Sequence, residues 1–115
     1  MIVRKLSEAK PYQAPNHRDY KSLRVFGAEM GGSQTLIFGI SHFLPGGGAD
    51  SDATPLEKVY VVLDGTVTVA TDEGEAELGP LDSCYLAAGE RRSVENRTNQ
   101  PASMLVVMPY PEDRS

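Results

Sequence analysis

Several side chains in the middle of this chain could hold a small anion and move protons on it. Arg92 presents a rigid fork of N–H donors that suits a carboxylate. Lys58 could act as a base, or as an amine that forms a Schiff base, if the protein removed it from water. Asp52, His42 and Tyr60 could each give or take a proton. These residue types favour acid/base chemistry on a small anionic molecule, provided that the fold brings them together.

The elements that must position these residues are predicted to be short β-strands. Turn signals recur at short intervals, which is typical of an all-β sandwich or barrel. The dipeptide Asp64-Gly65 suits a type I′ turn and is expected to close a hairpin. The pattern predicts one domain over residues 21–111, after an N-terminal arm of residues 1–20 and before a polar tail of residues 112–115. The expected strands are residues 23–28, 35–44, 58–63, 66–71, 75–78, 83–86, 92–95 and 103–108.

Alternation along two of these strands predicts which side chains face inward. In the strand 35–44, His42 shares the more apolar face with Leu36, Phe38, Ile40 and Leu44. This face is expected to point into the core, where His42 would be either a hydrogen-bonded core residue or a catalytic one. In the strand 58–63, Lys58 and Tyr60 share a side, and Tyr60 is expected to line the interior.

Two stretches of the sequence, residues 46–65 and a second that ends at Asn96, resemble the two conserved motifs of the cupin family. The first motif reads glycine, five residues, histidine, one, histidine, three or four, glutamate, six, glycine. The second reads glycine, five residues, proline, one, glycine, two, histidine, three, asparagine. Gly46 and Gly65 fit the first motif, and Gly89 and Asn96 fit the second. The resemblance implies a double-stranded β-helix, which is the jelly-roll barrel of the cupins.

The resemblance also implies a common location for the residues of chemical interest. Most enzymatic cupins bind a transition metal through three histidines and a glutamate, and in this sequence Asp52, Thr54, Arg92 and Lys58 occupy those positions. Two cations would then lie where a dication should bind, so neither a metal nor another cofactor is expected. We expect instead a receptor for a small carboxylate-bearing molecule. The expected substrate-binding residues are Arg92, Thr54 and Tyr60, and the expected catalytic residues are Lys58, Asp52 and His42.

Simpler roles for the same residues remain open from the sequence. Lys58 and Asp52 could form an ion pair that fills the cavity, and Arg92, which follows Arg91, could be a solvated side chain. Two functions are therefore considered: a metal-independent isomerase, lyase or cyclase, and a non-catalytic cupin that binds a small metabolite. Replacement of the metal ligands by charged rather than apolar residues favours the enzyme.

Composition limits the partners and the compartment. The net charge of −5 and the lack of a basic cluster argue against nucleic acid or an anionic membrane surface as a partner. No apolar run approaches the length of a membrane span, and the single cysteine, Cys84, cannot form an intrachain disulfide. A cytoplasmic protein is expected, with Cys84 as a small buried hydrophobe. Exposed sheet edges and the apolar residues of the arm predict a homodimer in which arms pair with the neighbouring sheet.

Overall fold

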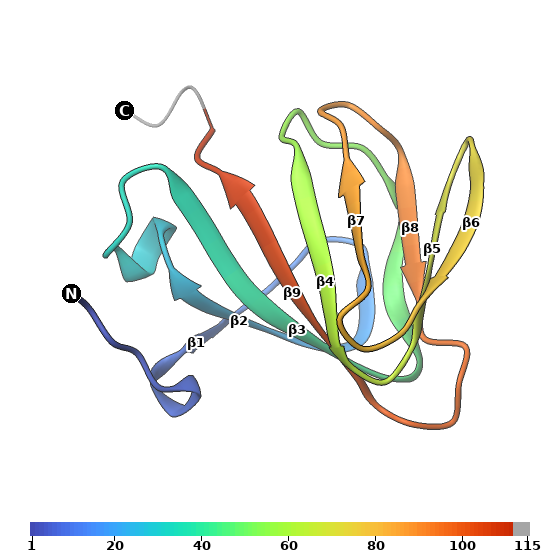
Figure 1. The fold of residues 1–115 in the computed structure, drawn as a ribbon, viewed down its shortest axis with the longest axis horizontal. Coiled ribbons are helices and arrows are strands. Elements are labelled where there is room, and N and C mark those ends of the chain that lie inside the picture. Colours follow the sequence, from blue (N-terminus) through green and yellow to red (C-terminus); the bar gives the residue numbers. More distant parts are fainter. Residues whose placement is uncertain (112–115) are drawn as a thin grey trace.

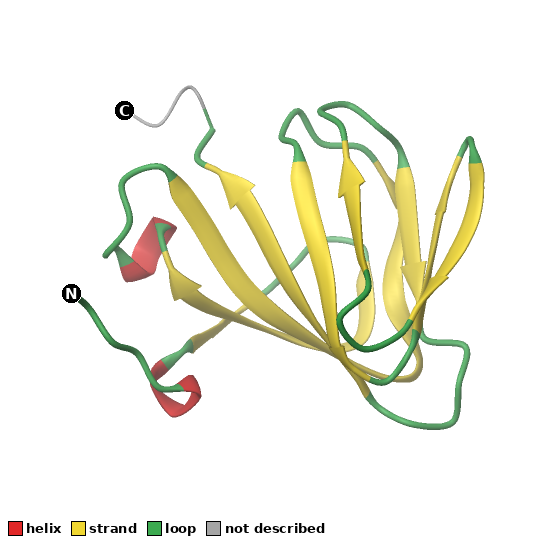
Figure 2. Cartoon of the chain, viewed as in Figure 1, coloured by secondary structure: helices red, strands yellow, loops and turns green. Residues whose placement is uncertain are grey.

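The predicted all-β fold is confirmed by a computed structural model of the chain, which describes residues 1–111 (Figures 1 and 2). The expected tail, residues 112–115, lies outside the described residues. Within residues 1–111, no helix is long and apolar enough to cross a membrane. The elements are η1 (Leu6–Glu8), β1 (Lys10–Tyr12), β2 (His17–Phe26), η2 (Ala28–Met30), β3 (Leu36–Asp52), β4 (Lys58–Asp64), β5 (Val67–Thr71), β6 (Gly74–Leu78), β7 (Ser83–Leu86), β8 (Arg92–Glu95) and β9 (Ala102–Pro109).

The strands form one hydrogen-bonded sheet that curls into a nearly closed jelly-roll barrel (Figure 1). Its order is β6-β5-β8-β3-β9-β4-β7, with β2 beside β3 and β1 beside β2. β3 is the strand that joins the two halves, because its first half pairs with β9 and its last residues pair with β8. The core between the halves includes Phe43, Val62, Val67, Val94 and Met104, each at most 2% exposed.

Two residues of the motif regions have structural roles in the bend of β3, one between the fixed positions of the first motif and one at the end of the second. At Gly48 a side chain would collide with the carbonyl oxygen of Val94, so only glycine lets β3 lie this close to β8. Asn96 is fully buried, and its side-chain amide donates to the carbonyls of Phe43 and Gln100 at 3.1 and 2.7 Å. These contacts tie the loop after β8 to β3. The motifs therefore identify the fold through its backbone requirements.

The hairpin expected at Asp64-Gly65 is not formed. β4 pairs with β7 and β9, whereas β5 pairs with β6 and β8. Gly65 has a φ of 75°, and a Cβ there would lie 2.5 Å from the carbonyl oxygen of Pro101. The glycine is thus required where the chain passes from one half of the barrel to the other. Local turn chemistry predicted the bend but not the partner of each strand.

The expected N-terminal arm forms part of the sheet of its own chain. β1 lies within residues 1–20, and β2 begins there as well. Arg4 donates hydrogen bonds to the carbonyls of Val25 and Met30 at 2.6 and 2.8 Å, and its guanidinium lies over the ring of Phe26. The start of the chain is therefore held against β2 and η2 within one subunit.

Candidate active site

One cavity of about 320 Å³ opens into the barrel, and its lining combines polar groups with apolar side chains, which we call the polar wall and the apolar wall. Five of the six residues that the sequence predicted for the site line this cavity. They come from the end of β3, the loop after it, β4 and β8: Asp52, Thr54, Lys58, Tyr60 and Arg92. The apolar wall is formed mainly by Phe43 and by the alternate residues Met104, Val106 and Met108 of β9.

The sixth residue, His42, lies on the outer face of the barrel. Its Nδ1 is 2.7 Å from the hydroxyl of Ser103 on the neighbouring strand β9. The buried residues of β3 next to it are Ser41 and Phe43, at 3% and 1% exposure, and both line the cavity. The expectation that His42 faces inward is therefore wrong, because the more apolar face of this strand is the outer one.

Arg92 is the central cation of the site. Only 8% of the residue is exposed, and its Nε donates a hydrogen bond to the hydroxyl of Tyr60 at 2.9 Å. A second donor of the guanidinium reaches the backbone carbonyl of Asp50 at 3.1 Å. Within residues 1–111 no carboxylate forms an ion pair with Arg92. The guanidinium is thus oriented by neutral oxygens, and its charge is left for a ligand.

Lys58 is half-buried near Arg92 and forms no ion pair with Asp52 in the described part of the chain. Burial lowers the pKa of Lys58, and the charge of Arg92 lowers it further. Asp52 instead accepts hydrogen bonds from the backbone N–H of Ala53 and the amide of Asn16, which lower the pKa of the Asp52 carboxyl. The alternative in which Lys58 and Asp52 close the cavity as an ion pair is not the arrangement observed.

Tyr60 contributes a protonated hydroxyl to the cavity. The residue is 4% exposed, and burial raises its pKa even though Arg92 acts in the opposite direction. Its oxygen accepts the hydrogen bond from Arg92, so its proton remains available for a ligand. The hydroxyl proton of Thr54 is already engaged, because it is donated to the carbonyl of Leu56 in a long hydrogen bond of 3.4 Å.

His17 lines the cavity but was not among the predicted site residues. Its Nδ1 lies 2.8 Å from the carbonyl oxygen of Pro15, and its ring lies near the rings of Tyr20 and Phe43, with centroids 5.0 and 6.4 Å away. A β-bulge explains why the sequence pattern hid it. Asp19 has a φ of 46°, and the register of β2 shifts between Arg18 and Tyr20. Strict alternation therefore fails at this point of the strand.

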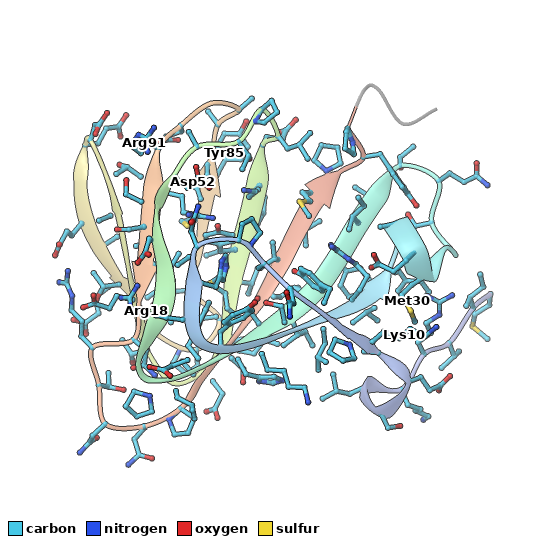
Figure 3. All side chains as sticks on the ribbon, turned by 180° about the vertical axis from the view of Figure 1, so that it is seen from behind. Lys10, Arg18, Met30, Asp52, Tyr85 and Arg91 are labelled. Carbon is cyan, nitrogen blue, oxygen red and sulfur yellow. The ribbon has the colours of Figure 1, made fainter. Side chains whose placement is uncertain are left out.

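The last residue of β1 and the start of the loop that leads to β2, residues 12–15, also line the cavity, and we call this segment the cap. Figure 3 shows this part of the chain passing in front of the barrel strands. The hydroxyl of Tyr20 fastens it, accepting from the backbone N–H of Ala14 at 2.9 Å and lying 3.2 Å from its carbonyl. The guanidinium of Arg24 stacks over the ring of Tyr12 at 4.0 Å. The N-terminal segment thus shapes the entrance of the site.

The residues of the cavity do not fit a transition metal. Within residues 1–111, no group of three histidine, cysteine, aspartate or glutamate side chains is arranged to hold one. Near Asp52, the cavity instead presents the amine of Lys58 and the guanidinium of Arg92, which would repel a dication. This part of the lining therefore brings two cationic side chains close to a single carboxylate among the described residues.

Comparison with known proteins agrees with this fold. The model of the cupin domain matches residues 39–108. A Mycobacterium tuberculosis protein named Beta-D-galactosidase Rv1717 is 42% identical over 111 residues, which cover 96% of each chain. Two solved structures are similar in fold. The polyketide cyclase RemF from Streptomyces resistomycificus has a TM-score of 0.83 and 19% identity, over 95% of this chain and 79% of that one. A sugar phosphate isomerase from Silicibacter pomeroyi has a TM-score of 0.80 and 21% identity, over 96% and 76%.

The chain therefore belongs to the cupin family, as the two sequence motifs predicted. The two solved structures support the jelly-roll barrel and nothing more specific, since their identities are low.

Proposed function

We propose that this cupin is a metal-independent enzyme that binds a small organic anion, such as a carboxylate, and moves protons on it. The observation that carries the proposal is the buried guanidinium of Arg92, held by Tyr60 and without an acidic partner in residues 1–111, beside the half-buried Lys58. Such cations are costly to bury unless a ligand completes them.

The geometry supports a separate role for each of these groups. Arg92 would bind the carboxylate of the substrate through the donors that do not reach Tyr60 or Asp50. The amine of Lys58 and the hydroxyl of Tyr60 would stabilise an oxyanion that develops when a proton leaves the substrate. Loss of one such donor typically costs a factor of about 10²–10³ in rate. An isomerase, lyase or cyclase would use this arrangement.

Ligand binding provides the first test. Benzoate carries a carboxylate on a ring that suits the apolar wall, and benzamide is its neutral counterpart. We expect calorimetry to show benzoate binding at least tenfold more tightly than benzamide, and the Arg92→Gln variant to lose this preference. Arg91→Gln is the matched control, because Arg91 is exposed and its one hydrogen bond within residues 1–111 is to the carbonyl of Ser51, at 3.5 Å. Equal affinities for the two ligands in the unmodified protein would overturn the anion site.

Catalysis is tested separately from binding. Phenylpyruvate combines a carboxylate with an acidic C–H group, and its exchange with deuterium in D₂O can be followed by NMR. We expect the protein to accelerate this exchange and Lys58→Met to slow it by a factor of about 10². Binding without exchange would favour the alternative function, a non-catalytic cupin that binds a small metabolite.

Metal independence has its own measurement. We expect protein purified without chelators to contain far less than one equivalent of iron, manganese, nickel or zinc. We also expect treatment with a chelator to leave benzoate binding unchanged. One bound equivalent of any of these metals by elemental analysis would contradict this part of the proposal.

A second candidate function, β-galactoside hydrolysis, is favoured by the name of the relative that is 42% identical over nearly the full length of both chains. Glycosidases usually need two carboxyl groups, and Asp52 is the single carboxylate among the described residues that line the cavity. Release of p-nitrophenol from its β-D-galactoside, lost in Asp52→Asn, would support this candidate. Hydrolysis of the α-anomer at the same rate would argue against it.

A further inference from the structure

We propose that His17 is the general base of the cavity and that it takes a proton from the bound molecule through Nε2. This assignment rests on the acid/base function proposed above. It adds to that function a catalytic residue from a part of the chain that lies before the residues 39–108 matched by the cupin domain.

The hydrogen bond to Pro15 fixes the tautomer of His17. A carbonyl oxygen can only accept, so the Nδ1 atom 2.8 Å from it must carry the proton of the ring. In the neutral ring Nε2 then has a free lone pair. Nε2 has no hydrogen-bond partner in residues 1–111, and the ring is part of the cavity wall. The base is therefore oriented before a ligand binds.

The surroundings keep this ring neutral. Burial lowers the pKa of His17, and the charges of Arg92 on β8 and Lys58 on β4 lower it further. The hydrogen bond to Pro15 and the charge of Asp50 on β3 act in the opposite direction. Asp52 also lines the cavity, but it is engaged with Asn16 and Ala53. The net effect is a lowered pKa, so the ring of His17 is neutral at neutral pH and can take a proton from a ligand.

The proposed step balances within the site. Nε2 forms a bond to a proton of the substrate, and the C–H or O–H bond that breaks leaves its electron pair on the substrate. That pair is delocalised onto an oxygen that faces Lys58 and the hydroxyl of Tyr60. The imidazolium of His17 then returns the proton to another atom of the same molecule, which completes an isomerisation or a ring closure without an oxidant, a reductant or a second substrate.

Alkylation by iodoacetate and by the uncharged iodoacetamide tests the assignment. Both reagents place a new N–C bond on a neutral imidazole nitrogen and release iodide, but only iodoacetate carries the carboxylate that Arg92 would bind. The Cys84→Ala variant removes the competing thiol, which lies outside the cavity. His42 is the other histidine of the chain and serves as an internal control. Peptide mass spectrometry would follow the rate at each site between pH 4.5 and pH 8.

We expect iodoacetate to modify Nε2 of His17 at least tenfold faster than iodoacetamide, and at least tenfold faster than it modifies His42. The rate should reach half its maximum below the ordinary histidine pKa of 6.5, and Arg92→Gln should remove the preference for iodoacetate. Equal rates for the two reagents at Nε2 of His17 would support the base and overturn the anion site. Modification at Nδ1, or a rate at His17 no higher than at His42, would overturn the assignment of the base.

The deuterium exchange of phenylpyruvate tests whether His17 acts as the base during catalysis. His17→Gln should slow the exchange by a factor of about 10²–10⁴ and remove its rise with pH, without weakening benzoate binding by more than a few fold. An exchange rate unchanged in His17→Gln would show that another group takes the proton.

Discussion

Arg92 and Tyr60 meet inside the barrel through a hydrogen bond of 2.9 Å, although β3 and β9 separate their strands in the sheet. The bond therefore spans the interior and joins the two halves of the molecule. It also directs the remaining donors of the guanidinium, because one side of its fork is already engaged. Loss of this hydrogen bond should therefore change the orientation of the Arg92 guanidinium and also lower the stability of the barrel.

Replacement of Tyr60 by phenylalanine removes the acceptor and leaves a buried N–H of Arg92 without a partner. We expect a loss of about 1–3 kcal/mol in the free energy of unfolding and a weaker preference for benzoate over benzamide. Urea titration and calorimetry would measure the two effects. Tyr85→Phe is the matched control, since Tyr85 is 59% exposed and, in the described part of the chain, its hydroxyl donates a single hydrogen bond, to Glu57. Equal losses in both variants would contradict the role of Tyr60.

Lys58→Met should make the protein more stable at pH 7, by about 0.5–2 kcal/mol, while the deuterium exchange of phenylpyruvate slows. The pKa of Lys58 is lowered in the folded state, so between that pKa and 10.5 the unfolded chain binds more protons and stability rises with pH. The gain from Lys58→Met should therefore disappear as the pH approaches and passes 10.5. A variant that is less stable by about 3–5 kcal/mol at pH 7 would instead indicate a buried ion pair with Asp52.

Tyr20→Phe should loosen the cap. It removes a hydroxyl that contacts both the N–H and the carbonyl of Ala14, at a cost of about 1 kcal/mol. Amide hydrogen exchange in residues 13–16 should become faster, and benzoate should dissociate more quickly. If exchange in these residues stayed unchanged, the cap would not depend on Tyr20.

The outer face of β3, β9 and β4 is apolar, and we expect a homodimer to bury it. Val59 is 37% exposed and lies beside Val107 and Tyr85, while Leu105 lies between Ile40 and Val61. Such a continuous apolar sheet face is unusual on a monomer. Light scattering should give twice the mass of one chain, and Val59→Glu should shift it to one chain.

Leu6→Glu separates this arrangement from an exchange of arms. Leu6 is 51% exposed and lies in η1, before β1, which β2 separates from β3 in the sheet, so its replacement should leave the dimer intact. Dissociation by Leu6→Glu but not by Val59→Glu would indicate that the N-terminal arms hold the subunits together.

The family motifs predicted the polar wall of the cavity because the cupin spacing is set by the backbone. Gly46, Gly65 and Asn96 mark where the strands must bend or be tied, and the positions between them then follow in order. Lys58 and Arg92 are found in this way even though neither is a usual residue at its position. The spacing therefore predicts where a residue lies in the fold, but it does not predict what the side chain does there.

His42 and His17 show what the sequence could not supply. Period-two alternation divides a strand into two faces, but it cannot say which face is inside when both carry apolar groups. In β3 the inner face holds Gly39, where a Cβ would lie 2.2 Å from the carbonyl oxygen of Leu23, and Ser41, which lines the cavity. The outer face is richer in large apolar residues. His17 was missed because residues 1–20 were predicted to be an arm, whereas β2 begins at His17. The bulge at Asp19, which depends on the pairing of β2 with β3, also breaks the alternation that could have placed it.

The position of the cap and of His17 in the chain has a consequence for how proteins of this fold diversify. Both belong to the first 38 residues, before the matched cupin domain begins, while Lys58, Tyr60 and Arg92 belong to the domain itself. The barrel can therefore be inherited with a constant set of cavity side chains, and the leading segment can change independently. Exchange of that segment between related proteins would alter the entrance and the proton acceptor together, and a new reaction could arise without any substitution in the barrel.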